Sequence, residues 1–239
     1  LGTLKGLEVP IPPLPEQKKI VEILHSVDKA KEKLELQRKK TENLFSGMKN
    51  DLIFNGIGKD NFKESIYGEI PNDWNVVDLK SYSKKICVGF VGTCEPFYRD
   101  SGIPLLRTGN LKKGELELRK LKYVSEEFHN KQIKSHLKEG DLLIARHGDH
   151  GQACIVPKNL EGANCLNIVI IRPDFNYFLP LFLKYFFNSN FMQSQFIKSA
   201  EGSTQKVIST TQIANTKVIM PPLKDQKIVV DSLTSLEKV

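Results

Sequence analysis

A cluster of cationic and amide side chains occupies positions 107–113, in the sequence Arg-Thr-Gly-Asn-Leu-Lys-Lys. Arg107 carries a forked cation, Asn110 an amide, and Lys112 and Lys113 two ammonium groups around one glycine. Forked cations and amides can pair with base edges, whereas ammonium groups more often contact phosphates regardless of sequence. The cluster, with Thr108, is therefore a candidate DNA-binding site. The alternative is that the lysines are ordinary solvated loop residues.

Two further segments offer similar donors and acceptors. Arg146, His147 and Gln152 surround a turn, and the flanking apolar runs predict that this turn is the loop of a β-hairpin. A second turn, Gly-Ser-Thr-Gln-Lys, contributes four more candidates: Ser203, Thr204, Gln205 and Lys206. Here too an alternative stays open, because a Ser or Thr in such a turn can simply cap it.

None of the motifs in this sequence that are similar to known catalytic or cofactor-binding motifs is complete. The segment 109–115 spaces two glycines as a phosphate-binding loop does, but the following Lys and Ser or Thr are missing. A Met-Pro-Pro-Leu segment is similar to the Pro-Pro turn of amino-methyltransferases, yet it lacks the Asn or Asp that would hold the target amine. His147, His150, Cys154 and Cys165 match no common zinc spacing. We therefore expect no catalytic residue, no metal site and no cofactor in this chain.

The composition is that of an ordinary globular protein. Of the 239 residues, 40% are hydrophobic and 26% charged, and 35 basic against 28 acidic residues give a net charge of +7. This basic excess suits a polyanionic partner. No apolar run approaches the ~18 residues of a membrane helix, and the first residues do not resemble a signal peptide. Four widely spaced cysteines predict free thiols, so we expect a cytoplasmic protein without membrane contact.

The chain contains one long-range repeat. The sequence from Pro12 to Lys18 recurs from Pro221 to Lys227, and similar residue types continue at the same offset beyond it. A repeat this long suggests a chain that begins at the end of one large unit and stops in the next junction. Residues 1–14 then correspond to the tail of a preceding domain, and 218–239 to the start of a second helix. The alternative is a chance similarity between two helix starts that follow prolines.

Residues 15–55 are expected to form one long helix, because two prolines precede it and nothing interrupts the next 40 residues. Its apolar residues follow a heptad pattern, which requires a partner helix. The predicted pairing residues are Ile20, Ile23, Leu24, Val27, Ala30, Leu34, Leu44, Met48 and Leu52.

Residues 56–217 have a different texture, in which short β-like runs alternate with glycine turns. A helical stretch at 179–199 carries phenylalanines that we expect in a core rather than in a base-stacking surface. The fold class predicted is α+β: a globular domain with β-sheet and short helices, attached to a long coiled-coil-type helix.

Several segments in this order closely resemble one protein family. They are PPLPEQKKIVEIL, GEIPNDW, IPLLRTGNL, LKEGDLLIAR, GSTQKVIS and VIMPPLKDQKIVV. Together they resemble the specificity (S) subunit of type I restriction-modification systems, over nearly the whole chain. The resemblance implies a non-catalytic subunit whose globular target recognition domain reads one half of a bipartite site in double-stranded DNA. It also implies long helices that space the domains and dock methyltransferase (M) subunits, which bring S-adenosylmethionine, in a complex with restriction (R) subunits.

The sequence departs from the family pattern because it holds only one complete recognition domain. It is then either an excerpt of a longer subunit or a half-sized subunit that forms a homodimer through the helix. Such a dimer would read an inverted, interrupted repeat. The alternative function is a non-enzymatic adaptor with a coiled coil and a protein-binding globular domain.

Overall fold

The computed structural model describes residues 10–146, 151–201 and 208–237. The chain separates into two compact units, Leu1–Gly47 and Met48–Val239, and each is described by itself. The division falls within the long helix rather than at residue 55. The last turns of the long helix belong to the globular unit, because Ile53 and Phe54 are buried in that unit's core.

Helix α1 spans Leu14–Asn55, in close agreement with the helix expected at 15–55. Glu16 lies in its first turn, where a carboxylate interacts favourably with the helix dipole. The helix ends at Asn55 and is followed by Gly56, which has a positive φ of 70°. A Cβ at this position would lie 2.8 Å from Trp74 Cζ2, so the close approach of the indole requires glycine.

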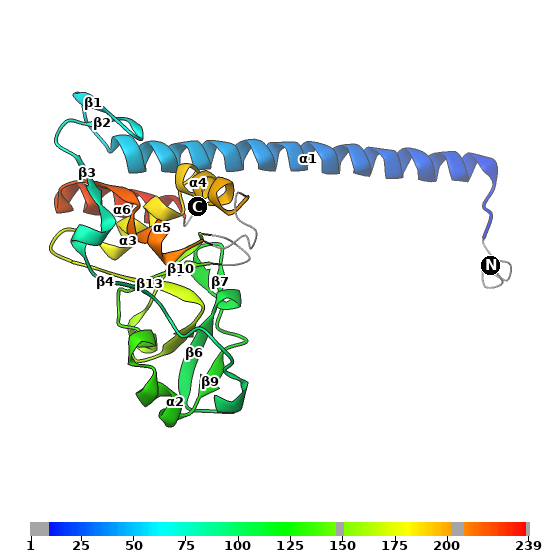
Figure 1. The fold of residues 1–239 in the computed structure, drawn as a ribbon. Coiled ribbons are helices and arrows are strands. Elements are labelled where there is room, and N and C mark those ends of the chain that lie inside the picture. The colour runs from blue at the N-terminus through cyan, green and yellow to red at the C-terminus, as the bar shows by residue number, and fades with distance from the viewer. Residues whose placement is uncertain (1–9, 147–150, 202–207, 238–239) are drawn as a thin grey trace. The chain divides into compact units, whose positions relative to one another are not determined.

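Two four-stranded sheets form the globular unit (Figure 1). The first has the order β11-β10-β13-β4, with antiparallel neighbours: β4 (Ser83–Val88), β10 (Leu142–Ala145), β11 (Ala153–Ile155) and β13 (Ile168–Pro173). The second has the order β12-β6-β9-β5: β5 (Tyr98–Arg99), β6 (Ile103–Arg107), β9 (Lys122–Val124) and β12 (Asn164–Leu166). In this second sheet β12 and β6 are parallel.

Three strand pairs complete the β-structure. They are β1 (Phe62–Ser65) with β2 (Gly68–Pro71), β3 (Asn75–Asp78) with β14 (Lys217–Met220), and β7 (Leu111–Lys112) with β8 (Glu115–Leu116). The pairing of β14 corrects one predicted boundary. Residues 218–220 complete a strand, so the helix expected from 218 begins only at Leu223.

The short helices are α2 (Glu126–Lys131), α3 (Pro180–Phe187), α4 (Asn190–Glu201), α5 (Thr210–Ala214) and α6 (Leu223–Leu236). Within the described residues there are also five 3-10 turns, at Leu79–Tyr82, Glu95–Phe97, Thr108–Asn110, Ile133–Ser135 and Lys158–Leu160. The helical stretch expected at 179–199 is divided into α3 and α4 around Asn188 and Ser189.

The largest core cluster joins the first sheet to the helices. Figure 1 shows α3, α4, α5 and α6 gathered on one side of this sheet, with the second sheet and α2 at the opposite end of the globular unit. Residues 182–187 of α3 are all buried, so the phenylalanines of this helix belong to the core as predicted. The α+β class with a long N-terminal helix is confirmed.

Candidate nucleic-acid interface

The β10–β11 hairpin carries one group of predicted site residues, and the loop position expected for it is confirmed. Arg146 follows β10 directly. Its Nε donates a hydrogen bond to the carbonyl oxygen of Ile208 at 3.1 Å, and its own carbonyl oxygen accepts one from the Ile208 N–H at 3.3 Å. Arg146 and Ile208 border the undescribed segments 147–150 and 202–207. Two of the predicted polar segments therefore start from neighbouring points of the fold.

The returning side of this hairpin is anchored on α4. Gln152 Nε2 donates to Gln193 Oε1 at 3.2 Å, and Gln193 Nε2 donates to the Gly151 carbonyl oxygen at 2.9 Å. Gly151 has a φ of 77°, and a Cβ there would lie 2.2 Å from the ring of Phe196. Gln152 is half-buried, so part of its side chain is accessible to solvent.

The β7–β8 turn brings Lys112 and Lys113 close to β11, which is an edge strand of the first sheet. Lys112 and Lys113 are exposed, and Lys113 has a positive φ of 50°. Next to the turn, Asn188 holds β11 through two hydrogen bonds of 2.8 Å, to the N–H and the carbonyl oxygen of Ala153. A Cβ at Gly114 would lie 2.9 Å from the Asn188 Nδ2 atom. The β7–β8 turn therefore packs directly against the Asn188 side chain that holds β11. Nothing in the sequence pattern distinguished Asn188.

An ion pair fixes the other side of the β7–β8 turn. Glu115 pairs with Lys184 of α3, a lysine that is only 9% exposed. This pairing occupies the acidic group nearest to Lys112 and Lys113 in the sequence. Glu115 is therefore paired with Lys184, while the side chains of Lys112 and Lys113 are exposed.

Asn110 requires a correction. It is 3% exposed, its Oδ1 accepts the Arg107 N–H at 2.9 Å, and its Nδ2 donates to the Glu117 carbonyl oxygen at 2.8 Å. Both ends of the amide are thus used to close the turn after β6. The prediction that Asn110 reads a base is wrong for this structure, because the amide is buried and satisfied.

The neighbours of Asn110 are also partly committed to the fold. Arg107 Nη2 donates to the Lys120 carbonyl oxygen at 3.3 Å, while its buried Nε has no partner among the described residues. Thr108 Oγ1 donates to the Asn167 carbonyl oxygen at 3.4 Å. Both residues are half-buried. Five other predicted site residues lie outside the described residues: His147, Ser203, Thr204, Gln205 and Lys206.

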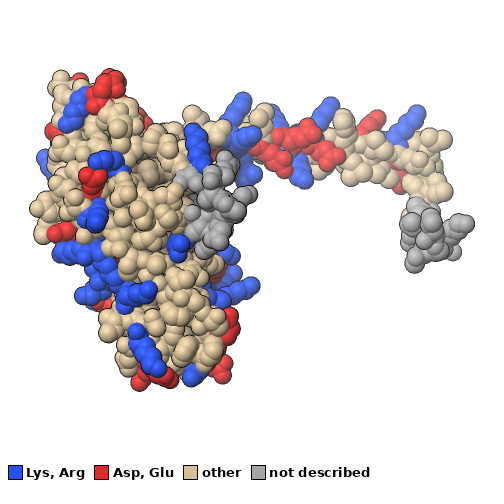
Figure 2. Space-filling model, viewed as in Figure 1, with Lys and Arg blue, Asp and Glu red and all other residues tan. Residues whose placement is uncertain are grey.

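A lysine-lined groove was not predicted. The groove has a volume of about 460 Å³ and lies between β4 and α5, and none of the residues that line it is acidic. Figure 2 shows Lys and Arg gathered on the flank of the globular unit where β4 runs. The polar residues that line the groove are Lys80, Ser83, Lys84, Lys85, Thr210, Thr211 and Asn215. The groove could not be predicted from the sequence, because the residues on its two sides, 80–86 and 210–215, are about 130 positions apart.

Two of these lysines have local partners. Lys84 lies 3.4 Å from Asp174, and Lys85 Nζ donates to the Lys134 carbonyl oxygen at 2.6 Å. Since β4 is an edge strand, lysines here also discourage pairing with another strand. A groove with three lysines, hydroxyls and an amide can in addition hold the phosphates of a nucleic-acid backbone.

The apolar stripe of α1 is exposed over most of its length. The large aliphatic residues that were predicted to pair expose between 44% and 69% of their surface: Ile20, Ile23, Leu24, Val27, Leu34, Leu44 and Met48. Val21 and Leu36, which the heptad count omitted, are equally exposed. Leu52 is the exception, since it packs against the core of the globular unit. This side chain is partly buried by its own domain, so less of its surface is left for a partner helix, and its pairing role stays a prediction.

All four cysteines are free thiols, as predicted. Burial raises the pKa of Cys94 to about 11 and that of Cys154 to about 12, so both remain protonated near neutral pH. Among the described residues no three or more His, Cys, Asp or Glu side chains are grouped as metal ligands would be, and His147 and His150 lie outside them. In the described part of the chain, every helix is too short or too polar to span a membrane.

Comparison with known proteins shows the family of this chain. The family model described as the type I restriction modification DNA specificity domain matches residues 1–42 and 71–239, well over half of the chain. The chain belongs to this family. The sequence resemblance to type I specificity subunits is thereby confirmed.

Curated relatives of this specificity-domain chain include the specificity subunit of the type I restriction enzyme EcoBI from Escherichia coli. It is 26% identical over 98% of the chain and 52% of the relative. The MjaVIII specificity subunit of Methanocaldococcus jannaschii is 27% identical over 98% of the chain and 56% of the relative. The chain thus spans about half the length of the curated relatives it matches.

Solved structures show the same fold. A chain from a study of complex assembly and conformational transition in a type I R-M system matches with a TM-score of 0.65 and 19% identity. The match covers 96% of this chain and 53% of that one. The HsdS subunit from Thermoanaerobacter tengcongensis matches with a TM-score of 0.54 and 19% identity, over 96% and 52% of the two chains.

Proposed function

We propose that this chain is a DNA-specificity component of a type I restriction-modification complex and that its globular unit binds one half of a bipartite DNA site. The observation that carries the proposal is the convergence of polar loops at one edge of the first sheet. Arg146 bonds to Ile208, Gln152 is anchored on α4, and the Lys112–Lys113 turn packs beside β11.

The division of labour follows from the side-chain types. Arg146 and Gln152 can discriminate bases through hydrogen bonds at their edges. Lys112 and Lys113, together with the lysine-lined groove beside β4, supply sequence-independent affinity by displacing counterions from phosphates. Asn110 acts through the turn it closes, and it has no polar group left for DNA.

Helix α1 supplies the second part of the function. Its exposed apolar residues from Ile23 to Leu44 need a partner, since a soluble helix rarely leaves such a stripe open. We propose that this stripe pairs with another long helix, from a second copy or a longer chain, and so sets the distance between recognition domains. The same helices would dock methyltransferase subunits, which would hold S-adenosylmethionine, and restriction subunits would join that complex in the cytoplasm. In this account the chain itself has no catalytic role.

DNA retention tests the proposal against the adaptor alternative. The chain, assembled with its methyltransferase partner, is passed over immobilised duplex DNA at moderate salt. We expect retention that needs this chain and that falls steeply with rising salt. A complex that assembles fully but is retained no better than the methyltransferase alone would favour the adaptor with a protein-binding domain.

A further inference from the structure

The outer side of β11 is an open strand edge, since β11 ends the first sheet and pairs only with β10 among the described strands. Val156, which follows β11, bonds toward β10. Its N–H donates to the Asp141 carbonyl oxygen and its carbonyl oxygen accepts the Gly140 N–H, both at 2.9 Å. The backbone groups of successive residues in an antiparallel strand point alternately to its two sides. Ala153 and Ile155 therefore direct their N–H and carbonyl groups away from β10.

Two neighbours of Ile155 close this edge on either side. At Ala153 the Asn188 side chain already bonds to the outward N–H and carbonyl oxygen, at 2.8 Å each. Its amide thus supplies the donor and the acceptor that a residue of an added strand would supply. Pro157 has no N–H, and its carbonyl oxygen accepts the Leu160 N–H at 3.0 Å. In the described part of the chain, no hydrogen bond reaches the outward N–H and carbonyl oxygen of Ile155.

An apolar cavity adjoins this open residue. This β11 cavity has a volume of about 450 Å³, and its aliphatic lining comes from Ile155, Leu179, Leu181 and Val230. The Ile155 side chain packs on the core cluster that contains residues of α3 and α6. The residue that pairs with Ile155 in an added antiparallel strand has its side chain on the same face of the sheet. That side chain is therefore directed toward the β11 cavity, where Leu181 is 42% exposed.

The charged residues that line the β11 cavity leave one carboxylate without a partner. Lys184 and Glu115 form the ion pair described above. Glu139 also lines the cavity, is exposed, and forms no ion pair with a described residue. A single uncompensated carboxylate beside an apolar site favours a ligand that carries a Lys or Arg side chain, because complementary charge selects the partner.

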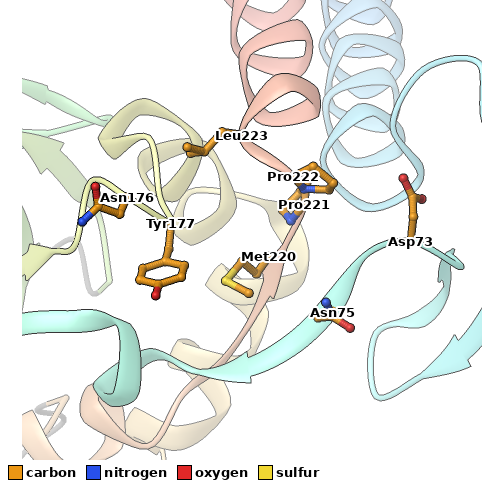
Figure 3. Close-up of a pocket in the computed structure, with 8 residues that line it drawn as sticks. All are labelled: Asp73, Asn75, Asn176, Tyr177, Met220, Pro221, Pro222 and Leu223. Carbon is orange, nitrogen blue, oxygen red and sulfur yellow. The ribbon is translucent and has the colours of Figure 1, made fainter.

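The cavity at the start of α6 offers less to a ligand. Figure 3 shows the chain turning from Met220 through two prolines into α6, with Tyr177 and Asn176 on one side of this cavity. Its volume of about 200 Å³ lies below the ~300–1,000 Å³ that is usual for ligand sites. Its acidic residue, Asp73, is already paired with Lys59 at 2.7 Å. The β11 cavity is therefore the better candidate for a binding site.

We propose that the outer edge of β11 binds a short extended segment of a partner protein, which adds to the first sheet as an antiparallel strand at Ile155. One residue of the segment exchanges two hydrogen bonds with Ile155, and its large aliphatic side chain fills the β11 cavity. A Lys or Arg of the same segment pairs with Glu139. In strand addition of this kind, main-chain bonds supply affinity and side-chain pockets supply selectivity. Because Asn188 and Pro157 close the edge on both sides, the segment has a single bonded residue.

Titration with a model peptide tests the proposal on the full chain without DNA, so its outcome is independent of the proposed DNA binding. The probe is acetyl-Thr-Lys-Thr-Leu-Thr-Lys-Thr-amide, in which a lysine lies on each side of the leucine. NMR follows the Ile155 N–H and the methyl groups of Leu181 and Val230. We expect these signals to shift together and saturably, with a Kd of about 0.1–1 mM, and hydrogen exchange at the Ile155 N–H to slow. The absence of these shifts at about 10 mM peptide would overturn the proposal.

Two controls separate strand addition from a merely apolar contact. Methylation of the leucine nitrogen in the peptide removes the donor to Ile155 but keeps the side chain, and it should weaken binding about tenfold. Leu181→Ser in the chain should weaken the unmodified peptide by a similar factor, because the cavity loses apolar surface. Ile133→Ser removes another exposed aliphatic side chain and should leave binding unchanged. Equal binding of the methylated peptide, or equal binding to Leu181→Ser, would contradict strand addition at this site.

The charge requirement has its own variant. Glu139→Gln should raise the Kd of the lysine peptide about twofold to threefold, as expected for an exposed ion pair. The same peptide with both lysines replaced by threonine should bind the parent chain and Glu139→Gln equally. A lysine peptide that does not distinguish the two chains would overturn the assignment of a basic residue to the partner segment.

Discussion

Arg146 and Ile208 are 62 residues apart in the sequence, yet they exchange two hydrogen bonds in the fold. One uses the guanidinium Nε and the other is a backbone bond. Together they join the loop after β10 to the chain that leads into α5. These two bonds hold Arg146 beside the start of the chain that leads into α5.

The lysine turn gives the first prediction. Lys112→Ala and Lys113→Ala should each weaken binding to all duplexes alike, because an ammonium group on a phosphate carries no sequence information. The slope of log K against log salt is negative, and each substitution should make it less steep by up to about 0.9. Titrations of the assembled complex at several salt concentrations measure both quantities. Lys131→Ala on α2, where the lysine pairs with Glu127, is the control and should leave the slope unchanged.

Asn110 gives the second prediction, and it concerns stability. Asn110→Ala should cost about 1–3 kcal/mol of unfolding free energy, since it removes the acceptor of the Arg107 N–H and the donor to the Glu117 carbonyl oxygen. Urea unfolding of the chain measures this cost, and the exposed Asn130→Ala supplies the comparison. A normal stability with an altered DNA sequence preference would restore the original interpretation of Asn110 as a base-reading residue.

The sequence predicts some parts of this molecule well because their determinants are local. Prolines, a helix-favouring composition and a heptad pattern are enough to define α1, and alternating apolar runs are enough to place Gln152 on a hairpin loop. Asn110 shows the limit. The residue type indicates hydrogen-bonding capacity, but only the tertiary fold decides whether the amide faces solvent or a turn.

Long-range proximity is the other limit. The groove between β4 and α5 joins residues from distant parts of the chain, and no spacing rule connects Lys84 with Thr210. Similarly, Leu52 fits the heptad pattern of α1, but Ile53 and Phe54 beside it enter the core of the globular unit. The pattern cannot tell which apolar residues a domain will cover itself.

The exposed face of α1 gives the third prediction. Val27→Asp and Leu34→Asp should abolish helix pairing or methyltransferase docking, because a carboxylate in an apolar seam loses hydration without gaining a partner. Both side chains are more than half exposed, so the fold of the isolated chain should not change. Sedimentation or size-exclusion measurements of the assembled complex provide the readout. Assembly that proceeds unchanged would contradict the proposed role of this face.

Asp225 gives the fourth prediction, through pH. Burial alone would raise the pKa of its carboxyl, but hydrogen bonds from Lys59 and the Trp74 Nε1–H hold the pKa below its ordinary value of 3.8. The unfolded chain therefore binds the proton at a higher pH than the folded chain. The stabilisation from this group is complete above that ordinary value and is lost as the pH falls through the lower folded-state pKa.

The measurement is Tm as a function of pH for the parent chain and Asp225→Asn. The variant should be less stable at about pH 7 and should lose less stability on acidification than the parent. Asp231→Asn, an exposed position on the same helix, should follow the parent curve. Parallel acid limbs for the parent and Asp225→Asn would refute the linkage.

The central claim is that this chain selects the DNA sequence on which a restriction-modification complex acts. Mapping methylated bases across the genome tests it most directly, in cells with the intact gene, in a deletion strain and in the complemented strain. The account predicts a methylated bipartite motif that disappears on deletion and returns on complementation. A methylation map that is identical in all three strains, with the methyltransferase present, would contradict it.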